Sequence, residues 1–321
     1  MPPTVCLVIF RRPEHTKRVA ESIAKSKPSK LMVFADGPRA DCPDDIRACA
    51  EAREMIDRVD WDCEVVKNYS DVNLGCGLGP ATAFNWVFQQ SEEAIILEDD
   101  CLPHPTFFKF CEELLERYRN DQRVMHINGC TYRRGDLRNP ASYYFCNDIG
   151  CWGWATWRRA WRKFDIAVNA WGELRNSRFL HEVIDCDHFE DHYKPALDAA
   201  YHNQGEVNYW DYQWAFACWV NSGLAIYPNH NLVTNLGWGP DATHTVDPNS
   251  PVANLPVREM RFPLIHPAIM YPKREIDRQG WHDPIPGVQP MGFGRILTRR
   301  VARLAPQPLR NFYRQCRAYL R

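Results

Sequence analysis

Apolar residues in the first 130 positions form short runs that alternate with stretches of helical periodicity. The runs, rich in β-branched residues, predict buried strands over residues 4–10, 30–35, 63–67, 94–97 and 124–127. Apolar residues spaced three and four apart predict helices over residues 14–25, 44–59, 81–90 and 105–118. Such alternation is typical of βαβ units, so we expect an α/β fold with a mostly parallel, Rossmann-like sheet flanked by helices.

The pattern changes after residue 142. Aromatic residues crowd between 143 and 161, and a mixed helical stretch extends to about residue 221. One further strand is predicted at 224–227, and Pro and Gly are then frequent up to residue 292. We therefore expect residues 131–283 to complete one domain with 1–130, partly as an irregular covering segment.

Polar residues follow three of the predicted strands. Asp36 ends the second strand, a glycine-rich turn at 73–80 follows the third, and Glu98, Asp99 and Asp100 end the fourth. Because ligands of parallel sheets bind at the carboxyl ends of the strands, we expect a binding site at this edge. An isolated acidic run is more often a solvated turn, but here it follows a buried strand.

Consecutive carboxylates at a strand end suit a divalent cation. Oxygen ligands of this kind hold Mg²⁺ or Mn²⁺, which neutralises the charge of a nucleotide diphosphate. The glycines at 75, 77 and 79 fit neither the GxGxxG pattern nor a P-loop, so we expect a packing turn there.

The order of these features resembles the DxD-type motif of GT-A-fold glycosyltransferases. The acidic run precedes a helix that opens with Pro105, Phe107 and Phe108, as in N-acetylglucosaminyltransferase I. A closer resemblance is to a bacterial group of nucleotide-diphospho-sugar transferases, also known as hemolysin-like proteins. Its recurrent segments look like residues 153–158, 210–214 and 241–245, so the likeness extends from residue 5 to about 244.

The resemblance implies a GT-A domain over residues 1–283, with 1–130 as the nucleotide-binding half and 131–283 as the acceptor half. Arg11 or Arg12 would approach the nucleotide, and Asp36 would accept a hydrogen bond from the uracil imide. Asp100 would bind Mn²⁺ or Mg²⁺ directly, while Glu98 and Asp99 would bind the ribose or tune the site. The implied reaction transfers a sugar, from a UDP-sugar in the first instance, to a glycan or lipid-linked glycan in cell-surface polysaccharide synthesis.

Three later residues complete the expected site. Asp211 stands near the start of an apolar helix, where it either stabilises the helix end or acts as the base of an inverting transferase. Trp154, with Trp152 and Trp157, either stacks on a sugar or belongs to the core. His244 follows a strand in a polar loop and, by the resemblance, is a second metal ligand.

Charge is distributed unevenly along the chain. Eight arginines and no acidic residue follow Asp283, which leaves 31 basic against 40 acidic residues in the chain up to and including Asp283. Apolar residues from 309 to 320 have helical spacing, so residues 284–321 are predicted to form a basic tail with an amphipathic helix. An anionic membrane surface reached through residues 293–321 is the expected partner, and docking on the acidic body is the alternative. No nucleic-acid motif occurs, so nucleic acid is not expected as a partner.

The chain has no run near the ~18 apolar residues that span a bilayer. Its first residues lack the charge order of a secretory signal, and its 13 cysteines show no CxxC spacing. We therefore expect a cytoplasmic protein, peripheral on the inner face of the cell membrane, with reduced thiols.

Two other functions are compatible with parts of this sequence. A sugar-nucleotide pyrophosphorylase shares the sheet and the metal, but it should carry a long glycine-rich and basic loop after the first strand. A non-enzymatic carbohydrate- or membrane-binding protein would depend on its aromatic residues and would tolerate loss of Asp100.

Overall fold

The computed structural model describes residues 3–132, 139–239, 247, 249–250 and 252–282, and the side chains only as far as 278. All of these belong to the first of two units of the chain, Met1–Asp283. The predicted tail helix and its membrane partner therefore lie outside the described residues, as does His244.

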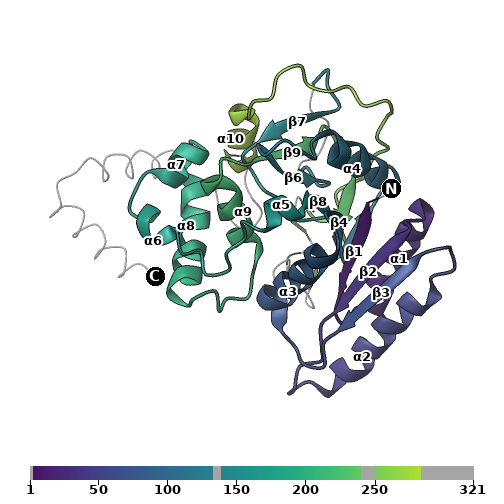
Figure 1. Ribbon diagram of the computed structural model, residues 1–321. Coiled ribbons are helices and arrows are strands. Elements are labelled where there is room, and N and C mark those ends of the chain that lie inside the picture. Colours follow the sequence, from purple (N-terminus) through teal and green to yellow (C-terminus); the bar gives the residue numbers. More distant parts are fainter. Residues whose placement is uncertain (1–2, 133–138, 240–246, 248, 251, 283–321) are drawn as a thin grey trace. The chain divides into compact units, whose positions relative to one another are not determined.

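An eight-stranded sheet with the order β3-β2-β1-β4-β8-β6-β9-β7 forms the centre of this unit (Figure 1). Its strands are β1 (Thr4–Ile9), β2 (Lys30–Ala35), β3 (Glu64–Tyr69), β4 (Glu93–Glu98), β6 (Val124–Asn128), β7 (Tyr143–Cys146), β8 (Trp154–Trp157) and β9 (Leu224–Pro228). Neighbours pair in parallel from β3 to β4 and between β6 and β9, whereas β8 and β7 run antiparallel to their neighbours. The predicted mixed α/β class with a mostly parallel sheet is confirmed.

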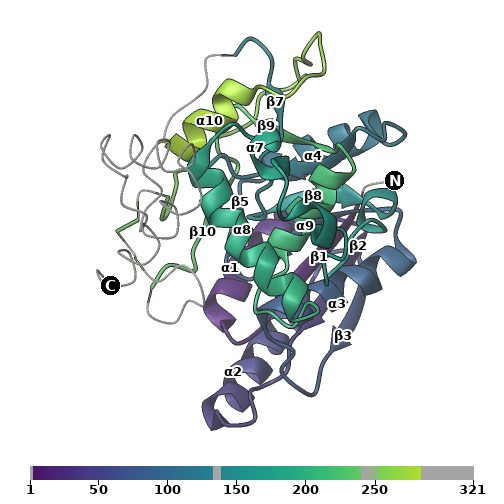
Figure 2. The ribbon, with the colours of Figure 1, turned by 90° about the vertical axis from the view of Figure 1, so that its left-hand side faces the viewer.

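Helices cover both faces of the sheet, because alternate residues of each buried strand point to opposite sides. On one face Val5, Leu7 and Ile9 pack with α1 (Pro13–Ser26), α2 (Pro43–Glu54), the 3₁₀ turn Met55–Arg58 and α4 (Thr106–Arg117). On the other, Cys6 and Val8 pack in a cluster that includes α3 (Gly75–Gln90), α8 (Asp187–His202) and α9 (Asp211–Val220). Figure 2 shows α8 and α9 side by side.

Smaller elements complete the unit. They are α5 (Arg158–Trp161), α6 (Trp171–Leu174), α7 (Phe179–Val183), α10 (Arg274–His282), β5 (Cys101–Pro103) and β10 (Val233–Asn235). β5 and β10 form a separate antiparallel pair in which Cys101 is opposite Asn235. This pair brings residues 235–237 beside the end of β4, 135 positions away in the sequence.

Two parts of the sequence form structure that the pattern did not predict. The aromatic stretch after residue 142 contains strands β7 and β8, which lie within the large sheet because their large side chains are buried on both faces. The glycine-rich turn is already helical, since α3 begins at Gly75 and not at residue 81.

Candidate functional site

A cavity of about 1040 Å³ lies at the carboxyl ends of β1, β2 and β4. It is lined by residues 10–12 after β1, by the turn into α3, and by segments 192–196 and 208–212 of the second half. The predicted residues that line it are Arg11, Asp36, Glu98, Asp99, Asp100 and Asp211. The structure thus brings together residues from both halves of the domain.

The three carboxylates at the end of β4, which we call the acidic triad (Glu98, Asp99 and Asp100), are held mainly by the loop after β1. The Phe10 backbone N–H donates to Oδ2 of Asp99 at 3.1 Å. The Arg12 guanidinium bridges two members, at 3.3 Å from Oδ1 of Asp99 and 2.7 Å from Oδ2 of Asp100. Asn235 donates to the other Asp100 oxygen at 3.3 Å.

Burial and the crowding of negative charge alter the ionisation of Glu98 and Asp99. Burial, followed by the charge of Asp100, raises the pKa of Asp99 to about 6, although Arg12 opposes the shift. Burial, together with the charges of Asp100, Asp99 and Asp211, also raises the pKa of Glu98. The single positive charge of Arg12 therefore does not balance the negative charges of these carboxylates. A divalent cation that prefers oxygen ligands fits this set of donors.

Asp36 already makes four hydrogen bonds. Its carboxylate accepts from the backbone N–H groups of Gly37 and Leu74 at 2.8 Å and of Gly75 at 3.0 Å. The Asn73 side chain donates at 3.0 Å. Because a carboxylate has about four acceptor positions, the predicted bond to a base requires one of these to be exchanged. In this structure Asp36 holds the start of α3.

The glycine-rich turn allows the two halves of the chain to approach closely. Gly75 has a φ of +76°, and a Cβ at Gly77 would lie 2.0 Å from the Val207 carbonyl oxygen. The Cys76 backbone N–H donates to Asn208 at 3.0 Å. The expected packing role of this turn is therefore what the geometry shows, and it places segment 207–209 on the cavity wall.

Arg11 and Arg39 form a basic group with the buried Asp45. Arg39 contacts both oxygens of Asp45, at 2.6 and 3.0 Å, and Arg11 lies 3.5 Å from it. The hydrogen bonds from Arg39 lower the pKa of Asp45 to about 2 against the effect of burial. Both arginines line the cavity, so its β2 side presents fixed positive groups.

Asp211 is the first residue of α9 and an exposed residue of the cavity lining. Its charge contributes to the raised pKa of Glu98, which places the two carboxylates in electrostatic contact. Helix α9 itself is fixed in the core through buried side chains such as Trp214. A rigid helix thus presents this carboxylate to the cavity opposite the triad's strand.

Trp154 does not line the cavity. It is fully buried in β8, where its ring stacks on His126 and Trp210 at centroid distances of 5.1 and 5.5 Å. Trp157 is buried as well, and Trp152 alone of the three contributes to the lining. Of the two interpretations of Trp154, stacking on a sugar or burial in the core, the structure agrees with burial in the core, because its strand lies inside the sheet.

Several lining residues were not predicted. Arg39 is only six positions from Asp45, and this spacing gave no distinctive signal. Asn235 reaches Asp100 solely through the β5–β10 pair. Tyr209 and Tyr212 flank the predicted Asp211, and hydrogen bonds to the Ala196 carbonyl and to His192, both 3.0 Å, fix their hydroxyl groups.

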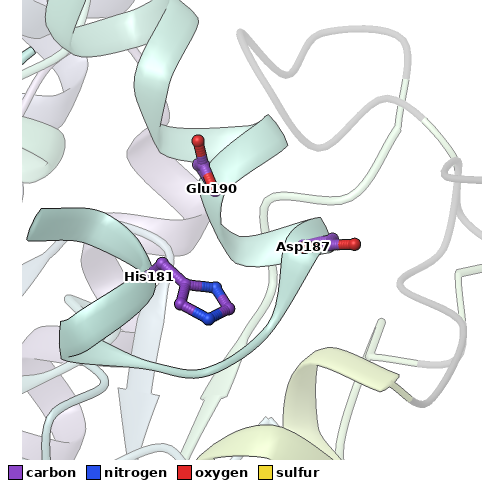
Figure 3. A group of neighbouring side chains, drawn as sticks. All are labelled: His181, Asp187 and Glu190. Atoms are coloured by element: carbon purple, nitrogen blue, oxygen red, sulfur yellow. The ribbon is translucent and has the colours of Figure 1, made fainter. Parts of the chain in front are cut away.

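A second group of possible metal ligands lies apart from the cavity lining. His181 of α7 and the α8 residues Asp187 and Glu190 have ligand atoms within 4.8 Å of one another (Figure 3). However, Nε2 of His181 is 3.0 Å from Asp185, which also pairs with Arg278. Carboxylates are also favoured at the start of any helix, so we interpret this group as an ion-pair network.

No protein-family model matches the chain, and no curated protein matches it either. Among solved structures, the mannosyltransferase PcManGT from Pyrobaculum calidifontis, in complex with GDP-Man and Mn²⁺, matches with 13% identity and a TM-score of 0.33. The match covers 49% of this chain and 45% of that protein, or less than half of its length. HddC from Yersinia pseudotuberculosis matches with 12% identity and a TM-score of 0.30, covering 50% of this chain and 78% of HddC. Neither match assigns an activity.

Among the described residues, no helix has both the length and the apolar character needed to cross a membrane.

Proposed function

We propose that this protein is a divalent-metal-dependent glycosyltransferase with a GT-A fold. It would transfer a sugar from a nucleotide diphosphate, in the first instance UDP, to a hydroxyl group of a glycan or lipid-linked glycan. The observation that supports this most is the meeting of the acidic triad with Asp211, over 100 positions later, in one cavity at the strand ends. Such an edge is where nucleotides bind in sheets of this kind.

The donor would extend from the β2 side of the cavity to the β4 side. Arg11 and Arg39 supply donors for the nucleotide at one side, and the triad would hold the cation at the other. Asp100 is the proposed direct ligand of Mn²⁺ or Mg²⁺, with Glu98 and Asp99 near the ribose, and His244 is retained as a proposed second ligand. When bound, the cation neutralises the charge that develops on the departing diphosphate.

Asp211 is the proposed catalytic base. Its carboxylate would accept the proton of the acceptor hydroxyl while the oxygen attacks the anomeric carbon, and the bond from that carbon to the diphosphate oxygen would break on the opposite face. Attack opposite the leaving group inverts the configuration. Tyr209 and Tyr212, on either side of the base, offer ring faces to an acceptor sugar.

A sugar-nucleotide pyrophosphorylase is the competing enzyme class. It should carry a long glycine-rich and basic loop between the first strand and helix. Here only residues 10–12 separate β1 from α1. This short connection favours glycosyl transfer.

We also propose that the protein acts at a membrane surface. An arginine-rich segment at 293–321 would bind an anionic membrane surface from the cytoplasmic side, near lipid-linked acceptors. Deleting the residues after 292 should abolish co-sedimentation with vesicles containing phosphatidylglycerol. Unchanged co-sedimentation would reject the proposed attachment.

The central test combines ligand binding with a matched pair of variants. Thermal unfolding would be followed with UDP, GDP and CMP compounds, their sugar conjugates and nucleoside triphosphates, each with Mn²⁺ or with EDTA. We expect stabilisation by one nucleoside diphosphate sugar, and only with Mn²⁺. Asp211→Asn should retain this stabilisation but lose transfer by about 10²–10⁴-fold, the usual contribution of a general base.

Asp187→Asn is the control, since Asp187 is also the first residue of a helix but does not line the cavity. It should transfer normally. If both variants lost the same amount of transfer activity, the effect at Asp211 would be explained by its place at the start of a helix and not by a catalytic role. Stabilisation by a nucleoside triphosphate, with turnover of a sugar phosphate, would instead support the pyrophosphorylase.

A further inference from the structure

Arg12 occupies the oxygens that the proposed cation needs. Its Nη1 atom lies 2.7 Å from Oδ2 of Asp100 and 3.3 Å from Oδ1 of Asp99, so one guanidinium nitrogen contacts both carboxylates. The side chain comes from the short loop after β1 and lines the cavity. It is about one-quarter exposed. Arg12 is therefore attached to the triad at the boundary between the core and the cavity.

The two carboxylates do not depend on Arg12 for their positions. Asp99 accepts a hydrogen bond from the Phe10 backbone. The Asp100 backbone carbonyl accepts from the Leu236 N–H at 2.7 Å, and its Oδ1 atom accepts from Asn235. These bonds would keep both side chains in place if the guanidinium moved away.

The Oδ2 atom of Asp100 is enclosed on another side by the backbone. A Cβ on Gly237 would come within 2.2 Å of this oxygen, so residue 237 approaches it as closely as only a glycine can. A cation bound at Oδ2 and the Arg12 guanidinium would therefore compete for the same position. A guanidinium carries one charge, against the two of Mn²⁺ or Mg²⁺.

We propose that Arg12 is a positioning residue that takes the cation's place on Asp99 and Asp100 and moves to the donor diphosphate when the cation binds. This inference rests on the proposed function, because it assigns the metal to the triad. Its consequence is thermodynamic coupling: the cation displaces Arg12, and the diphosphate provides the displaced guanidinium with a new anionic partner. Metal and nucleotide should therefore bind together much more tightly than either alone.

The test measures Mn²⁺ binding directly, through the electron paramagnetic resonance signal of the free ion, with and without UDP. In the wild-type full chain, UDP should raise Mn²⁺ affinity by at least about tenfold, within the usual range of such coupling. Arg12→Gln removes the competing charge, so Mn²⁺ affinity without UDP should rise about tenfold. In this variant the effect of UDP on Mn²⁺ affinity should be several-fold smaller than in the wild type, because only the direct contact between cation and diphosphate still couples them. Measurements at pH 8 lie above the pKa of about 6 of Asp99.

Two variants serve as controls. Arg12→Lys keeps the charge and should retain weak Mn²⁺ binding without UDP. Arg47→Gln removes an exposed arginine that pairs with Glu51 of α2 and lies outside the cavity lining, so its Mn²⁺ affinity without UDP should equal that of the wild type. Near-ultraviolet circular dichroism would confirm that each variant retains its aromatic packing.

The outcomes separate the inference from the proposed function. A folded Arg12→Gln protein with unchanged or weaker Mn²⁺ affinity without UDP would overturn the exchange and show that Arg12 merely orients the triad. Mn²⁺ binding that persists unchanged in Asp100→Asn would place the metal elsewhere, and the proposed function and the inference would fail together.

Discussion

The β2 and β4 sides of the cavity both contain buried carboxylates, but they compensate the charge differently. On the β2 side, Asp45 is enclosed by Arg39 and Arg11, and its pKa falls to about 2. On the β4 side, Asp99 shares a single arginine with Asp100, and its pKa rises to about 6. Both aspartates are less than one-tenth exposed, so burial alone does not explain the contrast.

The immediate partners differ: a hydrogen bond from Arg39 leads the fall in the pKa of Asp45, whereas burial and then the charge of Asp100 raise the pKa of Asp99. A buried carboxylate with its own arginines stabilises the fold, whereas carboxylates that repel one another cost stability and are retained where a ligand compensates them. The comparison therefore supports a structural role for Asp45 and is consistent with the proposed ligand-binding role of the triad. It also predicts opposite responses to mutation on the two sides.

Asp100→Asn should have the largest effect on activity. Loss of the proposed metal ligand removes several kcal/mol of transition-state stabilisation, so kcat/KM should fall about a thousandfold. The free energy of unfolding should remain equal or increase, because a repelling charge is removed. Steady-state kinetics and urea unfolding would measure the two quantities. A destabilised variant would show that Asp100 belongs with the structural carboxylates.

Asp45→Asn should act mainly on stability. Removal of the carboxylate leaves Arg39 and Arg11 without their shared partner, and the lowered pKa corresponds to about 2–3 kcal/mol of lost unfolding free energy. Affinity of the triad for Mn²⁺ should stay within a factor of about two, since no contact of Asp45 reaches it. Urea unfolding and a metal titration would check this. Loss of Mn²⁺ binding with an intact fold would contradict the division into two sides.

The fold was largely predictable because its first half repeats one physical pattern. Strands β1, β2 and β4 are apolar runs buried on both faces, β3 is a partly exposed strand beside them, and the observed bounds differ by only a few residues from those predicted. The later strands β7 and β8 were missed because their aromatic residues are equally compatible with a buried helix. β5 and β10 have three residues each, too few for any periodicity.

The site could be predicted where it depends on strand ends and not where it depends on pairing across the chain. Asp36, the triad and Asp211 reach the cavity because element ends place them there. Asn235 required the β5–β10 register, and the sequence left Trp154 open between the site and the core because residue type does not reveal which tryptophan lies inside the sheet. Arg11 and Arg12 were interchangeable in the sequence, but they contact different carboxylates in the structure.

The pH dependence of the unfolding free energy should sharpen the contrast between Asp99, whose pKa is raised, and Asp45, whose pKa is lowered. The raised pKa of Asp99 means that the folded protein binds a proton more readily than the unfolded chain between about pH 4 and 6. Relative to Asp99→Asn, the wild type should therefore be less stable by about 1–2 kcal/mol at pH 7.5, with the difference disappearing near pH 4. Urea unfolding of both proteins at each pH would measure it. Loss of the Asp99 charge also relieves part of the raised pKa of Glu98, which changes the difference in the same direction. A constant difference would mean that Asp99 is not held in a charged, repelling environment.

Arg39→Gln should have the smallest effect, although Arg39 makes the shortest contact to Asp45. Its side chain is 43% exposed, so solvent screens much of the interaction, and Arg11 remains as a second partner of the carboxylate. The unfolding free energy should fall by less than about 1 kcal/mol, and the affinity for a nucleoside diphosphate by less than about tenfold. Arg39→Lys, which keeps the charge without the planar two-point contact, should lie between the variant and the wild type. If Arg39→Gln were as unstable as Asp45→Asn, Arg39 alone would balance the charge of Asp45, and Arg11 would add nothing to stability. Asp45 and Asp99 would then differ in the geometry of their arginine contacts and not in the number of arginines.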